Sequence, residues 1–201
     1  MAIPPPLPPV TARTQGFSGR ARIPIVAGVG IVVLVAIGIF AASGMVAINR
    51  AKSASTLATA TSLEYSINQF YLNYGILPNP GSAKLSHDIV FDTAGLEGQA
   101  LLSILMAKEP GPPLQNSKKI VLFVGRPGTR GKNGVITLPS GFSELRDPWG
   151  NPYQVIIDGD YDETMTPPAD SSSTAPVRGR RVLVYSLGRD GKGGAEAVRT
   201  W

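Results

Sequence analysis

An uncharged apolar run near the N-terminus constrains this chain more than any other feature. Residues 23–48 carry no charge, and Ser43 is the only polar side chain among them. As a helix the run would measure about 39 Å, which exceeds the ~30 Å hydrocarbon core of a bilayer. A soluble helix of this length would show one polar face, and this run has none. It therefore predicts a transmembrane helix over residues 23–48.

The positive charge of the chain is concentrated around this run. The net charge is +5, but from residue 53 onward 14 basic and 14 acidic residues cancel. Basic residues beside an apolar span suit phospholipid headgroups, so membrane lipid is an expected partner and nucleic acid is not. More of them precede the run than follow it, which favours a cytoplasmic N-terminus. These flanking residues are Arg13, Arg20, Arg22, Arg50 and Lys52.

The segment before the run, residues 1–22, is rich in proline and poor in apolar side chains. This composition is typical of an extended, disordered tail. Removal of the apolar run as a secretory signal is the less favoured alternative, because the run exceeds the roughly 7–15 residues of a signal core. The small residues 41–44 leave that alternative open. The absence of cysteine is compatible with any compartment.

Beyond the run, residues 49–74 contain neither proline nor glycine, and apolar or small side chains recur every three or four positions. This spacing predicts an amphipathic continuation of the helix over residues 49–75. Gly75 and Pro78 then provide the stop. The anchor and its continuation read as one helix of about 50 residues. Its apolar stripe needs a cover from the rest of the chain.

That cover is expected from a globular domain over residues 76–201. Residues 101–106 predict a short second helix. Apolar runs bounded by turn-forming residues predict strands at 120–124, 135–138, 153–157 and 182–187. The predicted fold class is therefore α+β, with the long helix packed on a small antiparallel sheet.

Two loops have distinctive sequences. The first consists of Asp147, Pro148, Trp149, Gly150, Asn151, Pro152 and Tyr153. Its prolines fix φ, its glycine and asparagine permit a turn, and its aromatic rings can pin the loop to the domain. We expect Trp149 to be structural and not a binding residue. The second loop, residues 185–194, reads YSLGRDGKGG.

Together, in this order and behind a long N-terminal helix, these loops resemble the major pseudopilin of type II secretion systems. The resemblance covers the helix and residues 144–201, and it covers residues 84–140 poorly. It implies a pilin-like fold, a single pass through the bacterial inner membrane and a periplasmic C-terminal domain. It also implies assembly into a periplasmic filament for protein export. The implied partners are further copies or other pseudopilins, and secretion platform proteins.

The glycine-rich loop is the candidate metal site. Its glycines allow backbone carbonyls to turn inward, and Asp190 adds a hard oxygen of the kind that calcium selects. The resemblance implies a bound calcium with the Leu187 carbonyl and Asp190 as ligands. Glu196 stands where family members usually have adjacent acidic residues, so one acidic position is lost. The alternative is a glycine loop held by backbone hydrogen bonds.

A second acidic cluster comprises Asp158, Asp160, Asp162 and Glu163. Its spacing is similar to the start of an EF-hand loop. However, Glu163 occupies the position of the required glycine and Ala169 that of the closing glutamate. A solvated turn is therefore expected here in preference to a metal site.

Little in the sequence supports catalysis. The one histidine, His87, lies in a polar stretch, and no cysteine nucleophile exists. Residues 125–128 lack the lysine and the spacing of a phosphate-binding loop. No nucleophile-elbow motif accompanies His87. We therefore expect a protein that is not an enzyme.

The N-terminal region departs from the pseudopilin pattern. Gly16 and Phe17 are similar to a leader-peptidase site, but Arg20 and Arg22 follow where the family has apolar residues and a glutamate. Two hypotheses result. In the first, the chain is a pseudopilin-like structural subunit. In the second, it is an uncleaved, single-pass membrane-anchored module whose pilin-like domain binds a partner.

Overall fold

The computed structural model describes the backbone of residues 25–81 and 86–201, with side chains from residue 44 onward. The chain divides into two compact units, Met1–Met45 and Val46–Trp201. In the first unit the described backbone is helical. The predicted disordered tail and the candidate cleavage pair, Gly16 and Phe17, lie outside the described residues.

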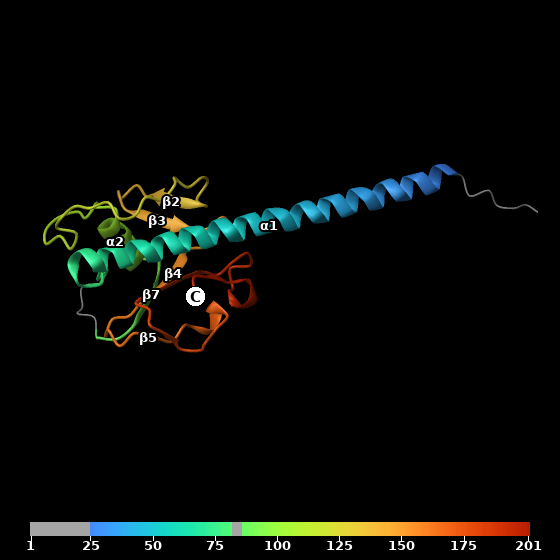
Figure 1. Cartoon of the computed structure of the whole chain (residues 1–201). Coiled ribbons are helices and arrows are strands. Elements are labelled where there is room, and N and C mark those ends of the chain that lie inside the picture. Colours follow the sequence, from blue (N-terminus) through green and yellow to red (C-terminus); the bar gives the residue numbers. More distant parts are fainter. Residues whose placement is uncertain (1–24, 82–85) are drawn as a thin grey trace, which may run out of the picture. The chain divides into compact units, whose positions relative to one another are not determined.

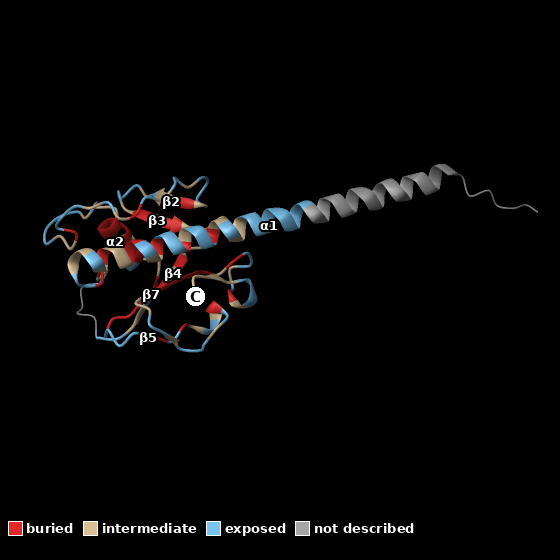
Figure 2. Cartoon of the chain, viewed as in Figure 1, coloured by how far each residue is buried: buried red, intermediate tan, exposed pale blue. Residues whose placement is uncertain are grey.

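Helix α1 extends over Ile25–Tyr74. Within the second unit its apolar stripe turns inward, and Leu63, Ile67 and Phe70 are fully buried. Figure 2 shows the resulting alternation of buried and exposed positions along this part of α1. The helix ends as predicted at Gly75, which has a φ of +72° and donates its N–H to the Tyr71 carbonyl at 2.8 Å.

No helix in the described part of the chain has a stretch long and apolar enough to cross a membrane. Most of the predicted span, residues 23–48, lies outside the residues whose side chains are described. The transmembrane assignment therefore stays a prediction from sequence.

The second unit is built on an antiparallel sheet in the order β1-β4-β7-β8. Its strands are β1 (Ile89–Asp92), β4 (Tyr153–Ile157), β7 (Val182–Ser186) and β8 (Val198–Arg199). Two small pairs accompany it: β2 (Gly134–Thr137) with β3 (Ser143–Arg146), and β5 (Thr164–Met165) with β6 (Val177–Arg178). Helix α2 spans Leu96–Leu105, and the 3-10 helices η1 and η2 span Ala169–Ser171 and Gly194–Glu196.

The sheet is buried on both faces. Alternating side chains of β4 and β7, such as Val155 and Val184, pack with the inward stripe of α1 in the main core. The intervening side chains Ile156, Leu183 and Tyr185 form a second cluster on the other face together with Met165 of β5, and Trp201 packs against this cluster. Figure 1 shows α1 lying against β4 and β7 in this unit. The predicted α+β fold, a long helix on an antiparallel sheet, is confirmed.

One predicted strand is wrong. Residues 120–124 form no strand. The N–H groups of Leu122 and Phe123 both donate to the Leu105 carbonyl at the end of α2, at 2.8 and 3.1 Å. The segment therefore lies beside a helix end and not beside another strand, so no ladder can form. Its apolar character is explained by Phe123, which is buried in the main core.

The connection around this segment is organised by Asn116, which is buried. Its Oδ1 accepts the Tyr74 hydroxyl at 2.6 Å and the Ile120 N–H at 3.0 Å. Its Nδ2 donates to the carbonyls of Ile104 and Ile120, both at 2.8 Å. This one side chain therefore joins the end of α1, the end of α2 and the irregular segment.

Candidate functional site

The first distinctive loop folds around the carboxylate of Asp147. This residue follows β3 and is fully buried. Its Oδ1 accepts the backbone N–H groups of Trp149, Gly150 and Asn151 at 2.7–2.8 Å. A buried charge is stable only when it is well hydrogen-bonded, and here three donors converge on one oxygen. The carboxylate thus fixes the turn that the two prolines and Gly150 permit.

The two distinctive loops are joined to each other. Asp147 Oδ2 accepts the hydroxyl of Ser186 at 2.6 Å, and Ser186 Oγ in turn accepts the N–H of Gly188 at 3.0 Å. Asn151 Nδ2 donates to the Gly188 carbonyl at 2.6 Å. Residues 147–153 and 186–188 therefore form one hydrogen-bonded unit at the end of β7. The sequence did not predict a role for Ser186, although this residue belongs to the second distinctive loop.

The aromatic residues of the first loop have different surroundings. Tyr153 opens β4 and is buried, and its backbone N–H donates to Thr93 Oγ1 at 2.9 Å. Burial raises the pKa of Tyr153 to about 12, while the hydroxyls of Thr59 and Thr56 on α1 act in the opposite direction. Tyr153 thus pins the loop to α1. Trp149 is half-buried, and its indole nitrogen is buried without a partner among the described residues.

The predicted calcium ligands in the second loop all have protein partners. The Leu187 carbonyl accepts the N–H of Gly193 at 3.0 Å. Asp190 is exposed, and its Oδ1 accepts the N–H of Lys192 at 3.0 Å. Glu196 is exposed and lies 3.9 Å from the guanidinium of Arg189. A glycine loop held by backbone hydrogen bonds accounts for this arrangement, and calcium at Leu187, Asp190 and Glu196 stays a prediction.

A different group of acidic residues is better placed for a metal ion. Asp88, Asp158 and Asp160 each offer a carboxylate oxygen, and these atoms all lie within 4.8 Å of one another. Such a cluster could hold a metal ion. The sequence offered Asp158 and Asp160 but not Asp88, which is separated from them by about 70 residues of chain. Asp162 and Glu163 are not members of the cluster, and both are exposed.

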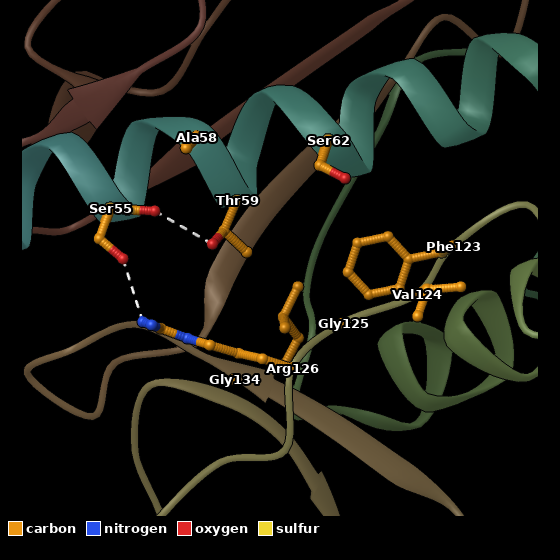
Figure 3. Close-up of a pocket in the computed structure, with 10 residues that line it drawn as sticks. Ser55, Ala58, Thr59, Ser62, Phe123, Val124, Gly125, Arg126 and Gly134 are labelled. Atoms are coloured by element: carbon orange, nitrogen blue, oxygen red, sulfur yellow. Dashed lines mark hydrogen bonds between the residues drawn. The ribbon is translucent and has the colours of Figure 1, made fainter.

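A shallow pocket lies between α1 and the irregular segment of the same unit (Figure 3). Its volume of about 240 Å³ is below the roughly 300–1,000 Å³ of typical ligand sites. Arg126 crosses it and donates to Ser55 Oγ on α1 at 3.0 Å. The lining residues are Ser55, Ala58, Thr59, Ser62, Phe123, Val124, Gly125, Arg126, Gly134 and Leu145, a set with no acid–base pair.

His87 is exposed, and its ring lies 3.4 Å from the hydroxyl of the adjacent Ser86. This contact with Ser86 is the hydrogen bond that the structure shows for the His87 ring. The absence of enzymatic activity stays a prediction.

No protein-family model matches the chain, and comparisons with curated proteins and with solved structures find no similar protein. The resemblance to major pseudopilins therefore rests on the two loops and the long helix. The described fold, a long helix packed on an antiparallel sheet, is consistent with a pilin-like domain.

Proposed function

We propose that the chain is a pseudopilin-like structural subunit, held in the bacterial inner membrane by residues 23–48. In this proposal its C-terminal domain is periplasmic, and copies associate with one another or with other pseudopilins through α1. The assembly would serve protein export together with secretion platform proteins. The proposal concerns a filament subunit and involves no catalytic step.

The outward face of α1 is the observation that carries this proposal. Between residues 53 and 74 the helix contains a single charged residue, Glu64, which is paired with Arg180 at 2.9 Å. The outward side chains include Leu57, Tyr65 and Leu72, which are 42%, 62% and 72% exposed. Surface helices normally place charged residues on the side that faces water. An uncharged face with large apolar side chains is instead typical of a surface that another protein covers.

The interlocked loops support the same proposal in a different way. Residues 147–153 and 185–194 carry the resemblance, and Asp147, Asn151, Ser186 and Gly188 hydrogen-bond them into one unit. The distinctive residues of both motifs thus have a shared structural role. A filament subunit requires such a structural role of these residues, because its globular domain must stay folded against α1.

Site-specific crosslinking tests the proposal, because the native chain contains no cysteine. Cysteine is introduced singly at Leu57 or Tyr65 on the outward face of α1. Leu96, which is 85% exposed at the start of α2, provides a matched control. Oxidation in membranes of cells that express the full chain should give disulfide-linked dimers with L57C and Y65C and not with L96C. Monomers alone, or equal crosslinking of all three variants, would argue against assembly through α1.

The alternative is an uncleaved membrane anchor that presents a binding domain. It is favoured by Arg20 and Arg22, which stand at the head of the apolar run where pseudopilins have a glutamate and apolar residues. N-terminal sequencing of the membrane-bound protein separates the two functions. A start at Phe17 supports the pseudopilin-like subunit, and a retained Met1 supports the anchored binding module.

A further inference from the structure

The register of the sheet brings two aspartates to the same end of one strand pair, and their carboxylate oxygens lie within 4.8 Å of each other. In the β1–β4 pair, Ile89 lies opposite Ile157, and the register continues toward Asp92 and Gln154. Asp88 directly precedes β1 and Asp158 directly follows β4, so both stand at the same end of the pair. Like charges at opposed cross-strand positions repel each other and destabilise a sheet. The arrangement therefore calls for something that offsets the repulsion.

Asp88 and Asp158 each have one carboxylate oxygen without a hydrogen-bond partner among the described residues. Asp158 is fully buried; its Oδ2 accepts the Glu163 N–H at 3.0 Å, but its Oδ1 has no partner among the described residues. Asp88 Oδ1 is likewise buried without a partner. Burial raises the pKa of both carboxyls, and the neighbouring Asp160 raises both further. A buried carboxylate oxygen without a donor is costly, and a bound cation is one way to offset that cost.

No basic side chain of residues 44–81 or 86–201 forms an ion pair with the cluster. Among the described residues, no ion pair includes Asp88, Asp158 or Asp160. The backbone carbonyl of Arg181 accepts the Asp158 N–H at 3.0 Å, so Arg181 lies beside the cluster. Its guanidinium, however, pairs with Glu163 at 2.6 Å and stacks over the Tyr71 ring. Within the part of the chain that the structure describes, the three carboxylates therefore have no ion-paired counter-charge.

We propose that Asp88, Asp158 and Asp160 bind a hard divalent cation, with calcium as the best fit. The donors are all carboxylate oxygens. Calcium binds oxygen ligands, whereas zinc favours nitrogen and sulfur ligands. Asp158 is the buried ligand, whereas Asp160 is exposed and leaves one side of the site open to water. Water molecules complete the six to eight ligands that calcium takes. Such a cation joins the two strand ends that otherwise repel each other.

This site is distinct from the glycine-rich loop that the resemblance indicates, and a calorimetric titration distinguishes them. The full chain in detergent, stripped of metal with a chelator, is titrated with calcium chloride. Binding of one ion at about 1 mM or below is expected, the range of partly open extracellular sites. The Asp158→Asn and Asp88→Asn variants should weaken this binding by about tenfold or more. The matched controls D162N, in the same turn, and D190N, in the glycine-rich loop, should bind as the native chain does.

Thermal unfolding of the same proteins shows that the variants are folded. Without metal, D158N and D88N should melt at or above the temperature of the native chain, because the repulsion between opposed carboxylates is reduced. Calcium should raise the melting temperature of the native chain, D162N and D190N, and should leave D158N and D88N unchanged.

Three results would overturn the assignment: no calcium binding to the native chain at millimolar concentration, loss of binding in D190N alone, or equal weakening in D162N and D88N. Tight zinc binding without calcium binding would also overturn the choice of cation.

Discussion

The carboxylate of Asp147 accepts a hydrogen bond from the hydroxyl of Ser186, with 2.6 Å between Oδ2 and Oγ. Both residues are fully buried, and 39 positions of sequence separate them. Because Asp147 also holds three N–H groups of its own turn, the contact fixes the glycine-rich loop relative to β3 and β4. The Asp147 side chain therefore makes a central contribution to the position of the glycine-rich loop, together with the hydrogen bond from Asn151 to the Gly188 carbonyl.

Replacement of Asp147 by alanine should be one of the most destabilising changes in the domain. It leaves three partly buried N–H donors and the buried Ser186 hydroxyl without their acceptor. We expect a loss of about 3 kcal/mol or more in the free energy of unfolding, measured by chemical denaturation. Ser186→Ala removes one of these bonds and should cost about 1–2 kcal/mol. Asp190→Ala in metal-free buffer is the control, and a loss as large as that of D147A would contradict this view of the loop.

Gly193 and Gly194 offer a matched pair of substitutions. Both have positive φ, at 78° and 61°, so alanine is strained at either position. A Cβ at Gly193 would stand 2.0 Å from the Asp170 carbonyl oxygen, whereas a Cβ at Gly194 meets nothing within 4 Å. G194A should cost about 1 kcal/mol of unfolding free energy, and G193A should cost clearly more. Equal melting temperatures for the two variants would count against the packing of η1 against η2.

The pKa of Tyr153 predicts a specific response to alkaline pH. Its pKa rises from 10.0 to about 12 on folding because of burial. The folded state holds the Tyr153 proton more tightly than the unfolded state does. The resulting contribution to the free energy of unfolding is therefore complete below pH 10 and is lost as the pH rises toward 12. The shift corresponds to about 3 kcal/mol. Y153F should therefore lose less stability than the native chain between pH 10 and 12.

Tyr185 acts in the same direction, since burial raises its pKa and the neighbouring Asp170 raises it further. The Tyr153 substitution should accordingly reduce the alkaline loss of stability and not abolish it. Y65F, at an exposed position of α1, is the control and should follow the native chain. Identical pH profiles of Y153F and Y65F would contradict the assignment.

Substitutions of two leucines of α1, Leu63 and Leu72, test the inward and the outward face of this helix separately. Leu63 is fully buried in the main core, and L63A should lower the free energy of unfolding by about 2–5 kcal/mol. Leu72 is 72% exposed, so L72A should change it by less than about 0.5 kcal/mol. Denaturation at low protein concentration measures both values for the unassembled chain. A large loss in L72A would show that the outward face is packed within the same chain.

Periodicity predicted the long elements well. The inward stripe of α1 follows the spacing read from the sequence, and β4 occupies residues 153–157 as predicted. The helix around residues 101–106 and the strands at 135–138 and 182–187 differ from the observed elements by a few residues. The side chains of these segments that face the core are apolar, so the apolar periodicity of the sequence agrees with the observed elements.

Elements that depend on distant partners were not predicted. Strand β8 has two residues and exists because Val198 and Arg199 pair with β7. Residues 120–124 have the composition of a strand, but their neighbour is the end of α2, and no local pattern contains that information. Asp88 joined the acidic cluster only through the β1–β4 register. The sequence therefore predicted the residues of the candidate loops better than it predicted which residues meet.

The order of the strands also determines when the domain can fold during synthesis. The inward stripe of α1 is made early, but its cover includes Val155 and Val184, which the ribosome adds about 90 and 120 residues later. Until then Leu63, Ile67 and Phe70 have no partner on the sheet. At 5–20 residues per second this interval lasts roughly 6–24 seconds. A nascent chain of this protein therefore exposes the apolar stripe of α1 for seconds. Until β7 is complete, chaperones or the membrane must cover this stripe to prevent aggregation.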